Sequence, residues 1–248
     1  MNIEFLGVGS GLSPELGNNN LLLTSDESDR QILVDCGFST PPELTKRENG
    51  LLNITDVMIT HVHSDHIGGL ELLGFTSFYV YRNLPDFRKI TLHFPTETLR
   101  NDVWQILEKG MENAQTVDGG NFIANLETYF DVKIGLEVNI DGFNPIKYVE
   151  TTHVEHMEAY SIWLTDKVYY SSDTVLLPPK NADLIFQDCQ LFESPTSVHT
   201  TFSFLEENMN QDQKNMTWLM HYGFNQNNID PVEHGFKGFV KRFQQFKV

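Results

Sequence analysis

The stretch Val57-Met58-Ile59-Thr60-His61-Val62-His63-Ser64-Asp65-His66-Ile67-Gly68-Gly69 decides how this chain is interpreted. Its first four residues predict a buried strand, and the Gly-Gly pair that closes it predicts a turn. Because His61 and His63 are two residues apart at a strand end, both imidazoles can face one ion. Asp65 and His66 lie past the turn and can reach a second ion. Imidazole and carboxylate ligands without thiolate are typical of a catalytic metal site rather than a structural zinc site.

The composition limits the possible partners. The chain has 248 residues, of which 40% are hydrophobic, and this is typical of a globular protein. Its 34 Asp and Glu outnumber 17 Lys and Arg, so the net charge is −17. Since long nucleic acids are bound mainly through basic side chains, this charge argues against a tRNA or duplex DNA partner. The sequence shows neither a signal-peptide pattern nor an apolar run near the ~20 residues of a membrane span, so we expect a cytoplasmic protein without a membrane partner.

The remaining sequence favours one α/β domain over residues 1–248, with mixed sheets and helices outside them. A helix is expected after Thr96, its N-cap, and before Gly110, its stop signal. The short β-branched runs that predict strands are Asn2–Leu6, Leu21–Thr24, Gln31–Val34, Val57–Thr60, Tyr148–Thr152, Tyr160–Leu164, Val168–Ser171, Leu184–Gln187 and Trp218–Met220.

The last fifteen residues, His234–Val248, differ from the rest because they contain four basic residues and no acid. Phe236, Phe239, Phe243 and Phe246 recur at spacings of three, four and three. This periodicity predicts a C-terminal amphipathic helix that docks on the domain.

The HxHxDH pattern of His61–His66 resembles the metallo-β-lactamase superfamily. That resemblance implies a four-layer αββα sandwich with two mixed sheets and a site for two metal ions, zinc or alternatively manganese. Asp173 matches the bridging aspartate, with Ser172 where the superfamily usually has glycine, and His221 matches the final histidine. The implied metal ligands are His61, His63, Asp65, His66, His153, Asp173 and His221.

A further superfamily histidine has two candidates, His153 and His156. We favour His153, which directly follows a strand-like run, and this leaves His156 as an outer or pocket residue. Asp35 and Asp188 are either buried carboxylates that orient ligand imidazoles or ordinary turn residues.

The other unassigned residues are expected to have structural roles. His93 is expected to be a hydrogen-bonded core residue. The two cysteines, Cys36 and Cys189, are expected to be packed and inert.

Two further segments look like the ribonuclease Z-like phosphodiesterase branch of this superfamily. They are Phe5–Gly11 with Asn18-Asn19-Asn20, and Asp183–Cys189 with Ser197–Thr201. In that branch a histidine at the position of His199 contacts the scissile phosphate and serves as general acid. The predicted catalytic residues are therefore His199 and Asp65.

Within this branch the chain most resembles the phage anti-Pycsar phosphodiesterases. The resemblance implies hydrolysis of 3′,5′-cyclic nucleoside monophosphates, such as cyclic CMP and cyclic UMP, to acyclic monophosphates. This reaction would interfere with cyclic-nucleotide immune signalling of the host. If the chain is phage-encoded, it would act in the host cytoplasm. It also implies a homodimer whose second protomer helps to complete the site. Tyr79, Tyr81, Arg82 and Phe224 are candidates for base stacking, although ordinary packing is favoured for them.

Three other functions remain open. A tRNA 3′-end endonuclease of the ribonuclease Z type is the main alternative, since it shares the same metal motif. A lactonase or thioesterase would have little use for His199. A protein that only sequesters nucleotides would have no need for a bridging Asp173.

Overall fold

The fold is built on two large mixed sheets in a computed structural model that describes residues 1–116, 118–194, 196–223 and 228–248. The first sheet has the spatial order β16 (Gln245–Lys247), β1 (Asn2–Phe5), β2 (Leu21–Ser25), β3 (Ser28–Val34), β4 (Asp56–Met58), β5 (Thr91–Phe94) and β8 (Asp131–Ile134). The second has the order β15 (Gly238–Phe239), β14 (Thr217–Met220), β13 (Leu184–Asp188), β12 (Val168–Tyr170), β11 (Ala159–Trp163), β10 (Ile146–Thr151) and β9 (Glu137–Val138). A separate hairpin joins β6 (Asn113–Gln115) and β7 (Asn121–Ile123).

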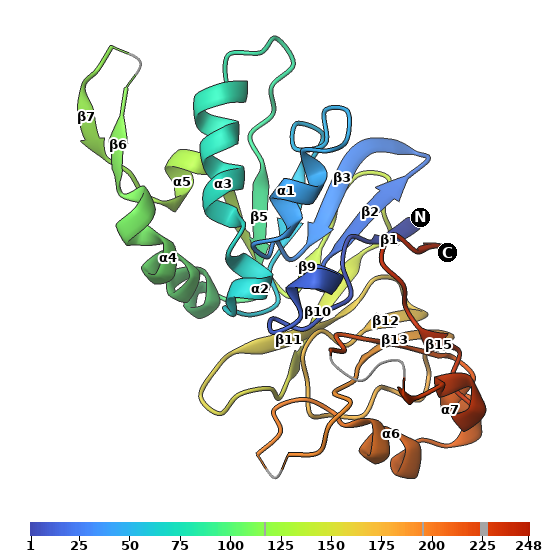
Figure 1. The fold of residues 1–248 in the computed structure, drawn as a ribbon. Coiled ribbons are helices and arrows are strands. Elements are labelled where there is room, and N and C mark those ends of the chain that lie inside the picture. Colours follow the sequence, from blue (N-terminus) through green and yellow to red (C-terminus); the bar gives the residue numbers. More distant parts are fainter. Residues whose placement is uncertain (117, 195, 224–227) are drawn as a thin grey trace.

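Helices lie outside the sheets (Figure 1). On the side of the first sheet are α1 (Thr40–Leu44), α2 (Ser64–Ile67), α3 (Leu70–Phe75), the π-helix η2 (Thr76–Tyr81), α4 (Glu97–Met111) and α5 (Leu126–Tyr129). On the side of the second are α6 (Phe202–Asn208) and α7 (Gln211–Lys214). The short 3-10 helices are η1 (Pro14–Leu16) and η4 (Pro231–His234). The predicted fold class, an α/β sandwich with two mixed sheets, is confirmed.

Strand pairing explains why the polar loops gather at one place. β1, β2 and β3 pair antiparallel, as their hairpin-like succession predicts, and β3, β4 and β5 then pair in parallel. In the second sheet β12, β13 and β14 are parallel as well. Parallel strands end at the same edge of a sheet, so the loops that follow them are neighbours. The two sheets pack through aromatic side chains such as Phe5 and Phe186, whose ring centroids are 5.0 Å apart.

The predicted helix after Thr96 is present as α4. The Thr96 hydroxyl accepts a hydrogen bond from the Leu99 backbone N–H, as an N-cap does. Leu99, Val103 and Leu107 are buried on one face. The helix continues through Gly110 to Met111, so the predicted stop was placed slightly too early.

The predicted C-terminal helix is wrong. Gly235 and Gly238 have φ values of 89° and 133°, which an α-helix does not contain, and the segment forms β15 and β16 instead. β15 pairs with β14 of the second sheet, whereas β16 pairs with β1 of the first. Phe239 packs on Tyr222, and Phe246 packs on Phe186. The helical spacing of the phenylalanines was therefore coincidental, because they pack in different places.

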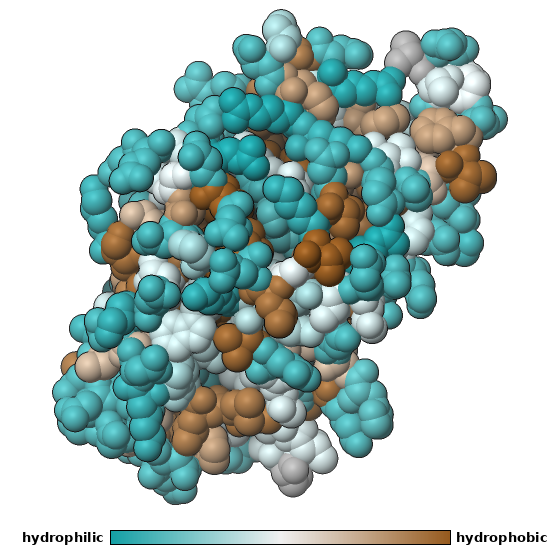
Figure 2. All heavy atoms as spheres, turned by 180° about the vertical axis from the view of Figure 1, so that it is seen from behind, coloured by the Kyte–Doolittle hydropathy of each residue, from teal (hydrophilic) through white to brown (hydrophobic). Residues whose placement is uncertain are grey.

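The surface matches the acidic, polar composition. Figure 2 shows a face covered mainly by hydrophilic residues, with hydrophobic residues in small separate groups. In the part of the chain that the structure describes, no helix has the length and apolar character needed to span a membrane.

Candidate metal centre

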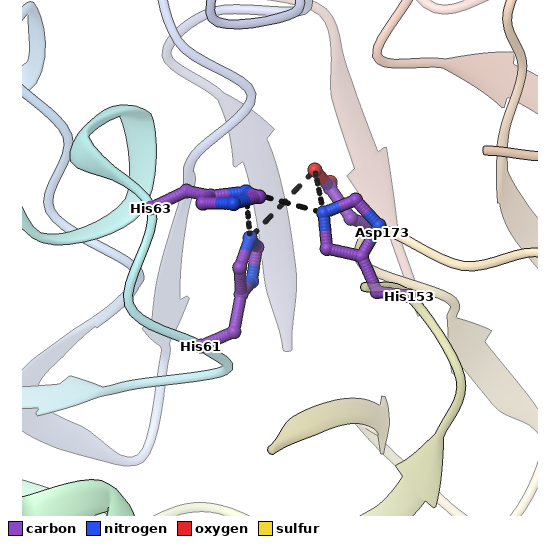
Figure 3. A group of neighbouring side chains, drawn as sticks. All are labelled: His61, His63, His153 and Asp173. Carbon is purple, nitrogen blue, oxygen red and sulfur yellow. Dashed lines mark hydrogen bonds and ion pairs between the residues drawn. The ribbon is translucent and has the colours of Figure 1, made fainter. Parts of the chain in front are cut away.

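A first ligand cluster consists of side chains that follow three strands, β4, β10 and β12. Its members are His61, His63, His153 and Asp173 (Figure 3). The nitrogen atoms His61 Nε2 and His153 Nε2 lie 3.2 and 3.1 Å from His63 Nδ1. Asp173 Oδ2 lies 3.7 Å from both His61 Nε2 and His153 Nε2. All four potential ligand atoms therefore converge on one point between the two sheets.

A second cluster shares Asp173 and adds Asp65, His66 and His221. Asp65 and His66 lie in α2, directly after His63, and His221 follows β14. Asp65 Oδ2 is 3.3 Å from His221 Nε2 and 3.4 Å from His66 Nε2. Asp173 Oδ1 is 3.5 Å from His66 Nε2, and its Oδ2 is 3.4 Å from His221 Nε2. The Asp173 carboxylate thus lies between the two clusters.

The backbone is strained just past the ends of the strands that precede these side chains. Asp35, Ser172 and His221 each lie one or two residues past the end of a strand, and their φ values are 63°, 50° and 57°. Non-glycine residues seldom adopt this left-handed conformation, which concentrates at functional sites. The sharp turn at each of these residues directs the polar side chains after the strand into the space between the sheets.

A hydrogen bond on the far nitrogen orients most ligand imidazoles. His66 Nδ1 lies 2.7 Å from Asp35 Oδ2, and His221 Nδ1 lies 3.3 Å from Asp188 Oδ1. His153 Nδ1 donates to the Val198 carbonyl at 2.7 Å. Of the two interpretations of Asp35 and Asp188, the orienting one is correct, since both are fully buried against imidazoles. With Nδ1 as the donor, each of these histidines turns an Nε2 lone pair toward the clusters.

The donor set fits divalent cations. Lone pairs that face one another at 3.1–3.2 Å repel unless a cation or proton lies between them. The spacing is close to the edge of a tetrahedron with zinc–nitrogen bonds, about 3.3 Å. In the second cluster, His66 Nε2 and Asp173 Oδ1 are buried and have no hydrogen-bond partner among the described residues. Such orphaned atoms are costly unless a ligand satisfies them.

Protonation differs between the clusters. Burial lowers the pKa values of His61, His63 and His153, so these imidazoles are neutral and ready to bind a metal ion. Burial also lowers the pKa of His221, but Asp173 and other carboxylates outweigh this effect and raise it to about 10. To ligate a metal ion, His221 would therefore have to give up a proton.

Asp173 itself stays ionised. Burial raises the pKa of its carboxyl group, but His221 and His66 outweigh that effect and hold the pKa well below its ordinary value. A fully buried carboxylate with this pKa needs positive charge beside it, which a divalent cation supplies.

His199 belongs to neither of these two clusters, but it forms a third group of possible metal-binding side chains with Asp173, Asp188 and His221. Its Nδ1 lies 2.8 Å from Asp188 Oδ2 and 4.0 Å from Asp173 Oδ2. Its side chain is 19% exposed, whereas Asp188 is completely buried. Burial lowers the pKa of His199, but Asp188 outweighs burial and raises it. Asp188 thus holds one edge of the His199 ring while the ring still reaches the solvent side of the site.

A cavity of about 450 Å³ opens on this site. Its polar wall comprises His63, Asp65, Asp173, His199 and His221. The turn Ser10–Ser13 and the segment Gln190–Phe192 form the rest of the lining together with Ser64 and Gly223. Gly11 lies directly on Asp65, since a Cβ atom there would come within 3.0 Å of the carboxylate carbon. The cavity has the volume of a small-molecule site.

Comparison with known proteins agrees with this geometry. A family model described as anti-Pycsar protein Apyc1 matches residues 1–246. The chain belongs to the Apyc1 family. It is 32% identical over 233 residues to an anti-Pycsar protein Apyc1 of Paenibacillus harenae, covering 90% of each protein. It is 33% identical over 244 residues to that of Bacillus phage BSP38, covering 90% of this chain and 89% of the relative.

The fold has close relatives among solved structures. The metallo-β-lactamase fold protein YhfI from Bacillus subtilis superposes with a TM-score of 0.72 over 99% of both chains, at 17% identity. This confirms the fold implied by the HxHxDH resemblance. Taken with the two ligand clusters, the Apyc1 family and this fold make the chain a metal-dependent hydrolase.

Other residues singled out from the sequence lie elsewhere in this Apyc1-family chain. The His156 side chain is 89% exposed and belongs to neither cluster, so the structure favours His153. His93 is buried and lies 2.8 Å from Asp56 Oδ1, as expected for a hydrogen-bonded core residue. The two cysteines are buried and free, and burial raises their thiol pKa values.

The three base-stacking candidates that the structure describes do not line the cavity. Tyr79 packs on Phe75 and Phe78 and lines a different cavity beside β6 and β7. Arg82 lies over the Phe78 ring, and Tyr81 packs against the core. Phe224 lies outside the described residues. Leu12 and Phe192 do line the cavity, but their positions in irregular loops carry no sequence pattern that marks them.

Metal removal tests the centre directly. After chelation and dialysis, saturating zinc is expected to raise the Tm of the wild-type chain by roughly 5–10 °C, because a ligand at about 100 times its Kd stabilises by about 2.7 kcal/mol. Asp173→Asn removes the carboxylate shared by both clusters and is expected to lose most of this shift. Asp166→Asn, at a carboxylate that is 91% exposed, is the matched control and is expected to keep it. An equal zinc shift in the wild type and Asp173→Asn would contradict the assignment.

Proposed function

We propose that this chain is a two-zinc phosphodiesterase that hydrolyses 3′,5′-cyclic nucleoside monophosphates, such as cyclic CMP and cyclic UMP, to acyclic monophosphates. Membership in the Apyc1 family supports a phosphodiesterase role. The observation that carries the proposal is that one small-molecule cavity borders both ligand clusters and the His199–Asp188 pair. A phosphodiester in this cavity meets ligands for two cations and a proton donor together.

The proposed ligands are His61, His63 and His153 at one zinc, Asp65, His66 and His221 at the other, with Asp173 bridging. Manganese is the alternative metal. Bound cations supply Lewis-acid activation of water and neutralise negative charge on the phosphate. The chain's own task is to hold the seven donors in position. Asp65, whose carboxylate lines the cavity, also orients the attacking water as a hydrogen-bond acceptor.

The charge around the cavity favours a small substrate. Among the described residues that line it, none is lysine or arginine. A cyclic phosphodiester carries one negative charge, which a metal pair neutralises without a basic groove. A tRNA substrate needs many phosphate contacts, and the net charge of −17 opposes them. We therefore retain the small nucleotide over the tRNA endonuclease.

His199 is proposed as the general acid. In the hydrolysis, the water oxygen bonds to phosphorus and one of its protons passes to the solvent. One ring ester P–O bond breaks, the departing alkoxide oxygen takes a proton from His199, and His199 then regains a proton from the solvent. The Asp188 carboxylate at 2.8 Å favours the protonated imidazole and fixes its orientation. His199 lines the cavity and its side chain is 19% exposed, so a leaving oxygen held in the cavity can reach it.

The apolar part of the cavity is proposed to hold the nucleobase. Leu12 is 81% exposed and Phe192 is 53% exposed, although both line the cavity. Gln190 Nε2 donates to the Phe192 carbonyl at 2.7 Å, and Ser10 N–H donates to the Tyr222 carbonyl at 3.2 Å. Both loops are thus anchored before a ligand arrives. Stacking on an aromatic ring accepts any base, because every base has a π-face.

The biological setting follows from the family. The relatives are described as anti-Pycsar proteins, and we propose that this chain likewise counters cyclic-nucleotide immune signalling. It would act in the cytoplasm, that of the host if the chain is phage-encoded. We also propose a homodimer, whose measurable consequence is a solution mass near twice 28.5 kDa.

The proposed reaction can be tested directly with cyclic nucleotides. The purified chain with zinc or manganese is expected to convert cyclic CMP, UMP, AMP or GMP to the acyclic monophosphate. Chromatography of the reaction mixture measures the product. Asp173→Ala is expected to lose at least 100-fold in kcat/KM, because both cations lose a ligand. If all four cyclic nucleotides remain intact with either metal present, the proposal is wrong. Cleavage of precursor tRNA by the same preparation would instead favour the endonuclease.

The role of His199 predicts a dependence on the leaving group. His199→Ala is expected to reduce kcat for a cyclic nucleotide by roughly 100-fold or more. On bis(p-nitrophenyl) phosphate the loss is expected to be much smaller, because nitrophenolate departs without a proton. Steady-state kinetics on both substrates gives the comparison. Equal losses on the two substrates would show that His199 acts in some other way.

The apolar wall predicts an effect on KM. Phe192→Ala is expected to raise KM for cyclic nucleotides by between about 5- and 150-fold, with kcat little changed, because base stacking contributes about 1–3 kcal/mol. Phe243→Ala is the matched control, since Phe243 is similarly exposed at 43% but does not line the cavity. An unchanged KM in Phe192→Ala would remove Phe192 from the base site without affecting the proposed reaction.

A further inference from the structure

Ser172 has an unusual conformation directly before Asp173. It is 1% exposed and has a φ of 50°, in the left-handed region that glycine adopts at least cost. Serine in this conformation retains the steric conflict of its Cβ atom. A strained residue persists only where surrounding contacts hold it, so the contacts of its side chain need an explanation.

The Ser172 hydroxyl contacts the strand end that carries the HxHxDH motif. Its Oγ donates to Thr60 Oγ1 at 2.9 Å. Thr60 Oγ1 in turn donates to Asp35 Oδ2 at 2.8 Å, and the Thr60 backbone N–H donates to Asp35 Oδ1 at 2.9 Å. This chain of hydrogen bonds joins the second sheet to the first within the ligand region.

The network fixes the direction of each proton. A threonine hydroxyl has one proton and two lone pairs. Since its proton lies toward Asp35, Thr60 Oγ1 accepts from Ser172 and, at 3.1 Å, from His61 Nδ1. His61 therefore carries its proton on Nδ1 and turns the Nε2 lone pair toward the first cluster.

The same network reaches the second cluster. Asp35 Oδ2 also contacts His66 Nδ1 at 2.7 Å, so His66 likewise presents Nε2. One serine hydroxyl thus influences a ligand in each cluster, besides preceding the shared Asp173. Without this donor, one lone pair of the buried Thr60 Oγ1 loses its hydrogen bond.

We propose that Ser172 is a positioning residue for the metal centre, whose hydroxyl holds His61 and His66 in the metal-binding orientation through Thr60 and Asp35. The inference rests on the metal centre of the proposed function and extends it to a residue that contacts none of the ligand nitrogens directly. It also gives a reason for a serine where backbone conformation alone favours glycine.

Two substitutions separate the hydroxyl from the backbone. Ser172→Ala removes the hydroxyl and keeps the Cβ atom, whereas Ser172→Gly removes both and relieves the strain. If the hydroxyl positions the ligands, both variants are expected to bind zinc about 10-fold more weakly, as outer partners of metal ligands typically do. Zinc affinity is measured by competition with a chromogenic chelator, and circular dichroism of the zinc-free proteins checks folding. The glycine variant keeps the test valid if the alanine variant folds poorly.

A double-mutant cycle tests whether Ser172 acts through Thr60. Thr60→Val removes the intermediate hydroxyl and is expected to weaken zinc binding on its own. Adding Ser172→Ala to Thr60→Val is then expected to cause little further loss, because the connection is already broken. Thr217→Val is the matched control, since the buried Thr217 hydroxyl donates to the Gln213 carbonyl at 2.8 Å, at the start of β14 and so at the opposite end of that strand from His221. Its zinc affinity is expected to match the wild type.

The outcomes are distinguishable. Wild-type zinc affinity in both Ser172 variants overturns this inference and leaves the metal centre intact. Additive losses in the double mutant also overturn it, because Ser172 then acts independently of Thr60. A wild-type chain that binds no zinc overturns the metal centre, and this inference falls with it.

Discussion

The buried carboxylate of Asp173 is the constraint on which the rest of the site depends. It is 1% exposed, and its Oδ2 lies 3.7 Å from His61 and 3.4 Å from His221, which belong to different sheets. An ionised group this deep is stable only with compensating positive charge. Two sheets must therefore bring to one point enough nitrogen donors that can carry positive charge or hold a cation. The sandwich is the arrangement that does so.

The two sheets place these donors near Asp173 through the loops at the ends of their strands. Parallel pairing of β3, β4 and β5, and of β12, β13 and β14, places the following loops at shared edges. Left-handed turns at Asp35, Ser172 and His221 then direct polar side chains inward. The strain at these turns is tolerated because hydrogen bonds such as that of Ser172 to Thr60 hold them. Site and fold are thus stabilised by the same contacts.

Local sequence patterns were reliable where a single interaction determines the structure. Thr96 caps α4 as predicted, because an N-cap needs only its own side chain and the next turn. The spacing of the C-terminal phenylalanines predicted a helix wrongly, because helical periodicity cannot show that β14 and β1 each have an edge available for pairing. Gly235 and Gly238 were the local signals against a helix, since both adopt positive φ. The aromatic residues Tyr79 and Tyr81 were equally ambiguous, and only packing shows that they lie away from the cavity.

The sequence by itself determined which donor groups are available, namely three histidines and an aspartate at fixed spacing after a strand. It also determined the acidic character that disfavours long nucleic acids. Only the tertiary structure decided between His153 and His156 and gave Asp35 and Asp188 their orienting roles. It also showed the contact of Ser172 with Thr60 and placed Leu12 and Phe192 at the cavity. The physical reason is that ligand type is a property of one side chain. Convergence, burial and hydrogen-bond direction are properties of segments far apart in the chain, which come together only when both sheets have formed.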